Sequence, residues 1–177
     1  KRYSEDEDVI IAAERRGEIV EGFKYGNSPL SYINNSEIVG KSLVLTTTNG
    51  TQAIDVSKAD GELLIGAFCN LKVLTEWLIK ENQDVMILCS GWKNRLNLED
   101  SLFAGAVVDI LLGAGFEFDI DSDAAIVTRL LYTTSGSDMA TFLENSSHRN
   151  RLKNLHLEKD IDYCLQLNTC NVVPKLI

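Results

Sequence analysis

The sequence predicts an α/β fold with three layers, α/β/α, in which a mainly parallel sheet is followed by a helical C-terminal part. Two observations predict it. Short aliphatic runs of strand length alternate with amphipathic helical segments, and the chain beyond Asp123 carries helical patterns only. Strands that alternate with such helices are typical of a largely parallel sheet covered by helices.

Four aliphatic runs are predicted to form the strands. Each run is short and continuous, as expected for a strand that is covered on both faces. They are Val9–Ala13, Leu43–Thr47, Leu63–Ala67 and Val85–Cys89. The acidic start of the chain, Lys1–Asp8, is expected to be solvated.

The helices are predicted from apolar side chains that recur at helical spacing. Asn70–Glu81 and Glu99–Leu112 are the two clearest cases, and Gln52–Val56 suits a shorter helix. Beyond Asp123 we expect Ala124–Tyr132, Asp138–Glu144, Ser147–Asn154 and Glu158–Leu167. Because no repeat, linker or low-complexity tract interrupts this order, residues 1–177 are predicted to form a single α/β domain.

The size and net charge of the chain limit the kinds of partner that it can bind. The chain has 177 residues, of which 45% are hydrophobic, so it can bury one real core. Its 17 Lys and Arg against 26 Asp and Glu give a net charge of −9. Such a surface repels nucleic acid and anionic lipid, while a helix N-terminus or a metal ion can still attract a small anion locally.

The cysteines and the hydropathy indicate a cytoplasmic protein without a membrane partner. Cys69, Cys89, Cys164 and Cys170 form no C-x-x-C pair and no zinc spacing, so they are read as reduced thiols. No apolar run approaches the roughly 18 residues of a membrane helix, and no signal-peptide pattern opens the chain.

The run from Lys41 to Thr51, K-S-L-V-L-T-T-T-N-G-T, joins a predicted strand to a polar turn. Asn49-Gly50 marks a turn that needs a positive φ, and a helix is expected to follow it. This arrangement points backbone N–H groups and a helix dipole at an anion above the loop. An ordinary polar turn with a capping role is the alternative.

Ligands of open α/β sheets collect at the C-terminal ends of the strands, which selects the loops after Leu43–Thr47, Leu63–Ala67 and Val85–Cys89. The last of these leads to Glu99-Asp100 at the start of a helix. The two carboxylates either hold a metal ion or simply complement the helix dipole.

Two further candidate functional features, His148 and the segment from Cys89 to Arg95, each have a structural interpretation as well as a functional one. His148 follows Ser146-Ser147, a credible helix N-cap, and either contacts substrate or has a structural role. Cys89 to Arg95 fits the C-x5-R skeleton of thiol phosphatases, although Trp92 stands where that loop has glycine and Leu88 where histidine precedes it. A structural cysteine at a strand end is the alternative there.

Taken together, the motifs resemble the 2-phosphosulfolactate phosphatase family. They follow one order over nearly the whole chain from about Gly17, and the threonine motif is the most specific of them. In chain order they are G-N-S-P-L (Gly26–Leu30), G-K-S-L-V-L-T-T-T-N-G-T (Gly40–Thr51), C-S-G (Cys89–Gly91), E-D (Glu99-Asp100), A-G (Ala104-Gly105), S-S-H (Ser146–His148), D-I-D-Y-C (Asp160–Cys164) and V-V-P (Val172–Pro174).

The resemblance implies a three-layered, Mg²⁺-dependent hydrolase that releases inorganic phosphate from (2R)-phospho-3-sulfolactate, a step associated with coenzyme M biosynthesis, or from a related small phosphorylated acid. Its expected partner is this small anionic phosphoester, and a homodimer stays open. The site residues it suggests fall into three groups. They are Asn27, Ser28, Thr46, Thr47, Thr48, Asn49, Gly50 and Thr51 for substrate, Glu99 and Asp100 for Mg²⁺, and Asp100 and His148 for catalysis, with metal-bound water rather than Cys89 as the nucleophile.

The sequence also departs from the family pattern. The N-terminal family segment, with its D-x-x-R-A-[ST]-[ST] type motif, has no match here, and Arg149 replaces the glycine that tends to follow S-S-H. Two alternatives to the metal-dependent hydrolase are a non-catalytic anion-binding module and a Cys89-dependent thiol phosphatase.

Overall fold

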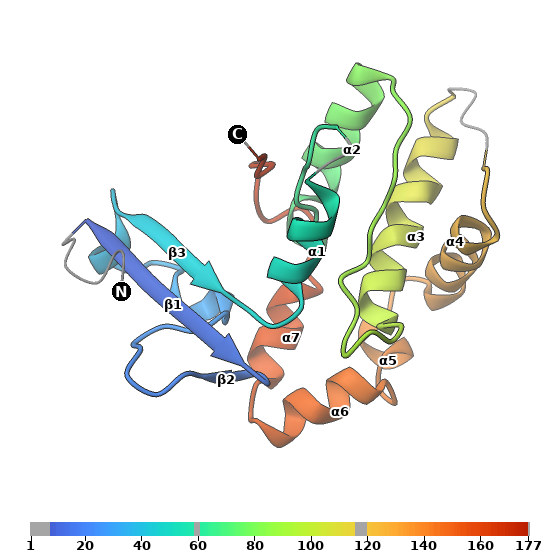
Figure 1. Ribbon diagram of the computed structural model, residues 1–177. Coiled ribbons are helices and arrows are strands. Elements are labelled where there is room, and N and C mark those ends of the chain that lie inside the picture. Colours follow the sequence, from blue (N-terminus) through green and yellow to red (C-terminus); the bar gives the residue numbers. More distant parts are fainter. Residues whose placement is uncertain (1–7, 59–60, 116–119, 177) are drawn as a thin grey trace.

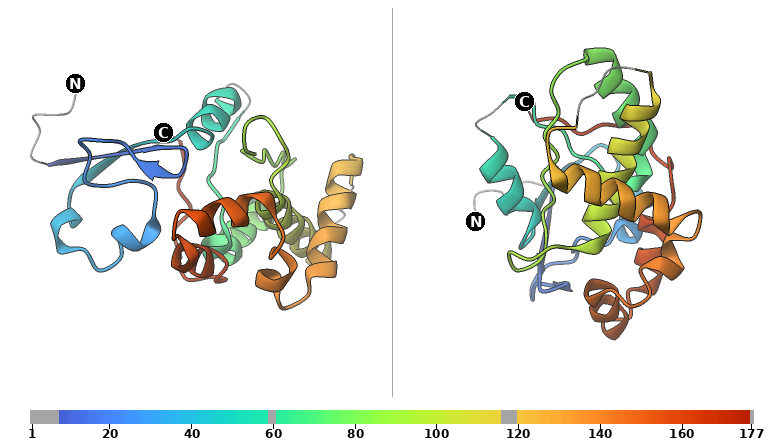
Figure 2. Two further views of the ribbon diagram at one scale, coloured as in Figure 1. Left: turned by 90° about the horizontal axis from the view of Figure 1, so that it is seen from below. Right: turned by 90° about the vertical axis from the view of Figure 1, so that its right-hand side faces the viewer.

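The computed structural model describes residues 8–58, 61–115 and 120–176, so most of the expected solvated start, Lys1–Asp8, lies outside the described residues. The fold is mixed α/β, with the strands gathered on one side and most helices on the other (Figures 1 and 2). The C-terminal half is helical, as the sequence predicts.

A small three-stranded sheet forms the strand part. It contains β1 (Val9–Arg15), β2 (Glu18–Ile19) and β3 (Ser42–Thr46) in the order β2-β1-β3. β1 and β3 are parallel, with Ala13 opposite Thr46, whereas β1 and β2 are antiparallel. The first two predicted strands are therefore confirmed, and the sheet is mixed.

The strands predicted at Leu63–Ala67 and Val85–Cys89 are wrong. Leu63–Ala67 instead lies beside the C-terminal segment, since Ile65 N donates to Pro174 O at 2.9 Å and Leu176 N to Leu63 O at 3.0 Å. Val85–Cys89 forms no strand in the structure, although Ile87 packs on the core while Met86 is 92% exposed. An aliphatic run alone does not make a strand: β1 and β3 pair over a ladder of residues, whereas Leu63–Ala67 makes one isolated bridge, Leu64 to Lys175. The described residues do not show the expected three-layer arrangement.

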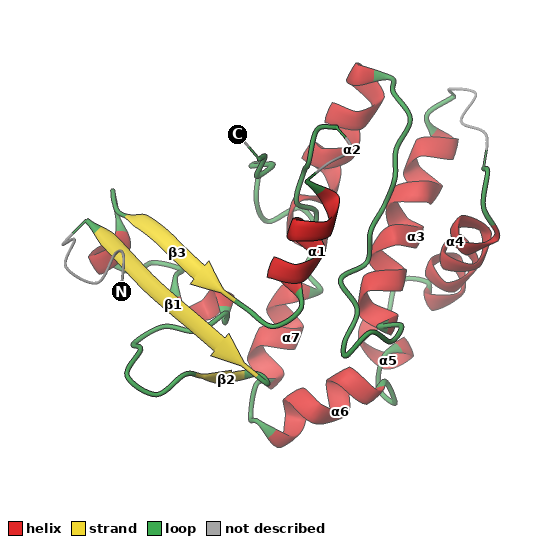
Figure 3. Cartoon of the chain, viewed as in Figure 1, coloured by secondary structure: helices red, strands yellow, loops and turns green. Residues whose placement is uncertain are grey.

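The predicted helices are confirmed with small changes at their ends (Figure 3). Local signals set their beginnings: the Asn97 side chain accepts a hydrogen bond from Glu99 N at 2.9 Å, and that of Ser146 accepts one from Arg149 N at 3.0 Å. The helices are α1 (Gly50–Ser57), α2 (Leu71–Glu81), α3 (Leu98–Gly113), α4 (Asp123–Ser135), α5 (Met139–Phe142), α6 (Ser147–Asn154) and α7 (Glu158–Cys164).

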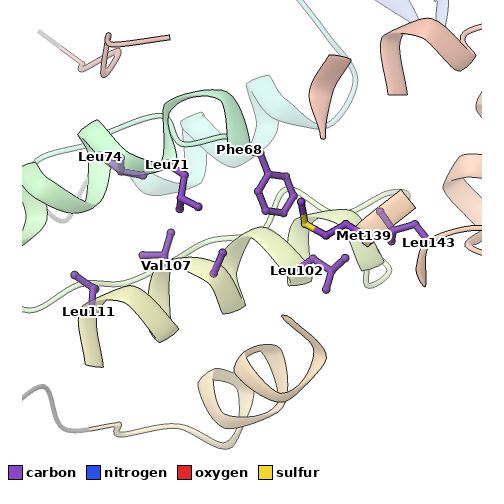
Figure 4. Packing of buried hydrophobic residues seen from close by; sticks show 9 residues of the cluster. Phe68, Leu71, Leu74, Leu102, Val107, Leu111, Met139 and Leu143 are labelled. Carbon is purple, nitrogen blue, oxygen red and sulfur yellow. The ribbon is translucent and has the colours of Figure 1, made fainter. Parts of the chain in front are cut away.

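The hydrophobic core lies in the helical part, between α2, α3 and α5 (Figure 4). Leu102 and Leu143 are fully buried, and Phe68 packs edge-on against Phe103 with ring centroids 5.5 Å apart. The buried cluster consists of Phe68, Leu71, Leu74, Leu102, Ala106, Val107, Leu111, Met139 and Leu143. This core fixes α3, whose first turn carries Glu99 and Asp100.

Helices α3 and α4 pack closely because Gly105 leaves room for the α4 backbone. A Cβ atom at Gly105 would lie 2.0 Å from Thr128 O, which no side chain can tolerate. Among the described residues, no helix is long and apolar enough to span a membrane.

Candidate active site

The first turn of α3 holds the two predicted carboxylates in different ways. Asp100 Oδ2 accepts hydrogen bonds from Gly91 N at 2.7 Å and from Ser90 Oγ at 3.2 Å. Glu99 Oε1 accepts one from Ser146 Oγ at 2.7 Å, whereas Glu99 Oε2 is buried without a hydrogen-bond partner among the described residues. Asp100 thus anchors a loop, and Glu99 keeps one oxygen atom unpaired.

The loop that Asp100 anchors is a tight turn closed on itself. Trp92 N donates to Arg95 O at 3.0 Å and Arg95 N to Trp92 O at 3.1 Å, while Lys93 and Asn94 both have positive φ angles. Gly91, with φ of +64°, is required here because a Cβ atom would lie 2.7 Å from Arg95 O. The backbone N–H groups of Gly91, Trp92 and Arg95 within the C-x5-R segment are therefore all occupied, that of Gly91 by Asp100 and the other two by each other's residue.

His148 lies next to these carboxylates. Burial lowers its pKa from the ordinary 6.5, Glu99 and Asp100 oppose this shift, and Arg151 adds to it. His148 also lines a cavity of about 330 Å³ together with the turn and the two helix starts. The cavity is lined by Trp92, Arg95, Leu96, Asn97, Leu98, Glu99, Ser146, Ser147 and His148.

Two arginines of α6 follow His148, and their side chains contact different parts of the molecule. Arg149, which replaces the glycine of the family pattern, donates through Nη1 to Ala140 O of α5. Arg151 Nη2 lies 3.2 Å from His148 Nδ1, and its guanidinium carbon lies 4.9 Å from the centre of the Trp92 ring. Sequence reasoning missed Arg151, because its position depends on contacts between distant segments.

The threonine loop, Thr46–Thr51, leads from the last residue of β3 into the start of α1 and is tied to the end of β1. Arg15 Nη2 donates to Thr46 Oγ1 at 3.2 Å. Glu14, only 6% exposed, accepts hydrogen bonds from Gly17 N and, at 3.4 Å, from Thr48 N. Thr51 Oγ1 donates to Thr47 O at 2.7 Å, which closes the loop on the start of α1.

The predicted positive φ in the Asn49-Gly50 turn is wrong. Helix α1 begins two residues earlier than the expected Gln52, so that Asn49, with φ of −103°, is its N-cap and Gly50 its first residue. Gly50 is not among the glycines with positive φ, so its backbone does not require glycine on that ground. The N–H groups of Asn49 and Gly50 donate to no other described residue, as is usual at a helix N-terminus.

The threonine loop and the carboxylates are connected through the turn after β1 and Arg151. Thr48 N and Gly17 N donate to Glu14, and Arg151 Nη1 lies 3.1 Å from the position that a Cβ atom at Gly17 would occupy, so the guanidinium lies beside this turn. Arg151 in turn contacts His148, beside Glu99. Figure 1 shows the same approach, with the carboxyl end of β1 pointing toward α6 and α7.

Asn27 and Ser28 lie apart from these contacts. Ser28 Oγ donates to Asp160 Oδ1 of α7, and Asn27 is exposed. No hydrogen bond among the described residues joins either of them to Glu99 or to the threonine loop. That all the predicted site residues share one cleft stays a prediction.

A larger surface hollow, of about 520 Å³, lies on the strand part but offers no unpaired charge. Lys24 pairs with Glu37, and Tyr25 donates to the same carboxylate at 2.8 Å. Within residues 8–58, 61–115 and 120–176, no group of three or more His, Cys, Asp and Glu side chains is arranged to hold a metal ion.

The family model of 2-phosphosulpholactate phosphatase matches residues 1–177. The chain belongs to this family. One relative, named probable 2-phosphosulfolactate phosphatase, comes from Caldicellulosiruptor saccharolyticus; it is 36% identical over 91% of this chain and 68% of its own length. A protein of the same name from Clostridium acetobutylicum is 31% identical over 99% of this chain and 72% of its own length. A protein of the same name from Thermotoga petrophila is 36% identical over 97% of this chain and 72% of its own length.

Membership confirms the resemblance inferred from the motifs. The rule that selected loops at the ends of strands could also have found Glu14, because Glu14 to Gly17 follows the apolar part of β1. Applied to this first strand as well, the rule would have placed Glu14 beside the threonine loop.

Proposed function

We propose that the chain is a Mg²⁺-dependent phosphatase that hydrolyses (2R)-phospho-3-sulfolactate or a related small phosphorylated acid. Water attacks phosphorus, the ester P–O bond breaks, and the products are an alcohol and inorganic phosphate. The observation that carries the proposal is the unpaired, buried Oε2 of Glu99 beside His148. A buried carboxylate oxygen without a partner is costly, so a ligand that satisfies it is expected.

Mg²⁺ fits this oxygen. The ion prefers hard oxygen ligands and often takes only one or two protein carboxylates, so Glu99 with Asp100 suffices without a larger cluster. Glu99 Oε2 would be a direct ligand, and Asp100 would hold the ion while its Oδ2 keeps the Gly91 turn in place. When bound, Mg²⁺ supplies charge neutralisation for the phosphoryl oxygens.

The threonine loop is proposed to bind the phosphate or the sulfonate. The free N–H groups of Asn49 and Gly50 at the start of α1 suit an anion, as does the dipole of that helix. Thr46, Thr47, Thr48 and Thr51 are proposed to add hydroxyl contacts, and Asn27 and Ser28 to complete the pocket wall. His148 is proposed to contact the substrate or to give a proton to the leaving oxygen.

The thiol phosphatase alternative has weaker support. Such an enzyme needs a thiolate and a loop of free N–H groups around phosphate. Here burial raises the pKa of the Cys89 thiol, and Asp100 adds to the shift. The N–H groups of Gly91, Trp92 and Arg95 are already occupied.

The test is phosphate release from 2-phosphosulfolactate and from a panel of small phosphoesters, in Mg²⁺, in chelator and after thiol alkylation. Glu99→Gln should lower kcat by at least about 100-fold, as expected for loss of a group that stabilises developing charge. The matched control is Glu158→Gln, which removes an acid from the first turn of α7 and should keep full activity.

The results of this assay distinguish the metal-dependent phosphatase from its two alternatives. Activity in chelator that disappears in Cys89→Ser would establish the thiol phosphatase and refute the metal-dependent mechanism. No turnover of any phosphoester, together with binding of inorganic phosphate, would favour the non-catalytic module. The role in coenzyme M biosynthesis, the cytoplasmic location, a homodimer and a three-layer arrangement stay predictions of the same proposal.

A further inference from the structure

The Arg151 side chain joins the helical part of the molecule to the end of the sheet. From α6 it contacts His148 Nδ1 through Nη2 at 3.2 Å and covers the Trp92 ring. On its other side, Nη1 lies 3.1 Å from the position that a Cβ atom of Gly17 would occupy. Gly17, with φ of +86°, therefore gives the guanidinium room next to the turn after β1.

This guanidinium lacks an acidic partner. None of the ion pairs among residues 8–58, 61–115 and 120–176 includes Arg151, and its Nε is buried without a hydrogen-bond partner. A partly buried guanidinium outside any ion pair gains stability when a ligand supplies a directly bonded negative charge.

The position of the guanidinium is the one where α/β sheets bind ligands. Gly17 follows the carboxyl end of β1, and the neighbouring parallel strand β3 ends at Thr46 in register with Ala13. The threonine loop begins at the same edge. A guanidinium also offers forked N–H donors whose geometry matches the oxygens of phosphate, sulfonate and carboxylate groups.

We propose that Arg151 binds an anionic oxygen group of the substrate at the carboxyl edge of β1 and β3. The same side chain positions His148: a guanidinium only donates hydrogen bonds, so Nδ1 is the acceptor and the neutral ring carries its proton on Nε2. This inference rests on the proposed phosphatase function and adds a substrate-binding residue to it.

Binding of inorganic phosphate, measured by calorimetry, tests the anion contact independently of turnover. Arg151→Met should weaken phosphate binding by about 10- to 100-fold, and Arg151→Lys by less, because lysine keeps the charge but loses the fork. Lys153→Met is the matched control, since it removes the same charge from the same helix, and its affinity should stay within about twofold. Unchanged binding by both Arg151 variants would overturn the proposal. If the methionine variant fails to fold, the lysine variant decides.

Kinetics identify which anionic group is bound. An equal rise in KM for p-nitrophenyl phosphate and 2-phosphosulfolactate in Arg151→Lys would assign the guanidinium to the phosphoryl group. A larger rise for 2-phosphosulfolactate would assign it to the sulfonate or carboxylate. If the wild-type chain hydrolyses neither these two compounds nor any member of the phosphoester panel, the proposed function fails, and phosphate binding alone decides the role of Arg151.

The ¹⁵N NMR signals of the imidazoles test the positioning role. His148 and His156 are the two histidines, so their signals are easily separated. The wild type should show His148 protonated on Nε2, and Arg151→Met should give a mixture of tautomers while His156 stays unchanged. A His148 ring protonated on Nδ1 in the wild type would contradict the contact.

Discussion

The helical part and the strand part of the molecule differ in how firmly they are built. In the helical part, Leu102 and Leu143 are fully buried. In β3, by contrast, Leu43 and Leu45 are 47% and 40% exposed. Core packing therefore fixes Glu99 by way of α3, and the hydrogen bond from Ser146 Oγ to Glu99 holds the start of α6, with His148, beside it. The threonine loop instead depends on hydrogen bonds with Glu14, which accepts from Thr48 N, and Arg15, which donates to Thr46.

This difference teaches where the candidate site is sensitive to change. Loss of packing in the helical part should unfold the protein, because its buried residues contact one another cooperatively. Loss of a hydrogen bond in the strand part should displace the threonine loop and leave the rest folded.

The largest effect is expected for Leu102→Ala. Removing a fully buried leucine from the core should lower the free energy of unfolding by about 2–5 kcal/mol. Leu45→Ala in β3 is the comparison and should cost about 1 kcal/mol or less, because Leu45 is 40% exposed. Urea denaturation measures both, and equal losses would mean that the two parts do not differ.

A smaller and local effect is expected for Glu14→Ala. The change removes the acceptor of Gly17 N and Thr48 N, which should cost about 1–3 kcal/mol. Hydrogen exchange of these two amides should accelerate, while amides of α3 stay protected. Glu18→Ala, an exposed acid in β2, is the control. Faster exchange throughout α3 would show that the strand part also supports the core.

The pH dependence of stability should separate the two parts further. His148 has a lowered pKa in the folded chain, mainly through burial, against 6.5 as its ordinary value. Neutral, buried His148 contributes its full stabilisation to the free energy of unfolding above pH 6.5. This stabilisation declines as the pH falls from 6.5 toward the pKa of His148 in the folded chain, because in this range the unfolded chain binds the proton and the folded chain does not. Urea denaturation at several pH values in chelator should show this decline in the wild type and less of it in His148→Gln. A wild-type chain that gains stability relative to His148→Gln on acidification would contradict it.

The smallest expected effect is a change in the rate at which the Cys89 thiol is modified. Because burial raises the pKa of Cys89, iodoacetamide should modify it at pH 7 more slowly than free cysteine, with the rate rising toward alkaline pH. Mass spectrometry in metal-free buffer follows the reaction, and Cys89→Ser identifies the peptide. Rapid modification below pH 7 would indicate a thiolate and return the thiol phosphatase to consideration.

Sequence reasoning succeeded where the signal is local. The spacing of apolar residues predicted Leu71–Glu81 and Leu98–Gly113 closely, and the capping signal at Ser146 predicted α6. It failed for Val85–Cys89, because a strand also requires a neighbour, which an aliphatic run does not specify.

The residues of the candidate site also fall into those that local motifs predicted and those that they did not. Motifs selected Glu99, Asp100 and His148, which do lie together. Arg151 and Glu14 were missed because each matters through contacts with a distant segment.

The exposed strand β3 should also influence how the protein behaves in concentrated solution. Among the described residues, β3 pairs with β1 on one side, so its other backbone edge can take up a further strand. Leu43 and Leu45, two residues apart, expose apolar side chains on one face of this edge strand. Exposed apolar edges of this kind promote strand pairing between molecules and aggregation, which lysine at an outward position prevents by charge repulsion. Samples of this chain should therefore be kept dilute, or carry Leu45→Lys, if colloidal stability is needed.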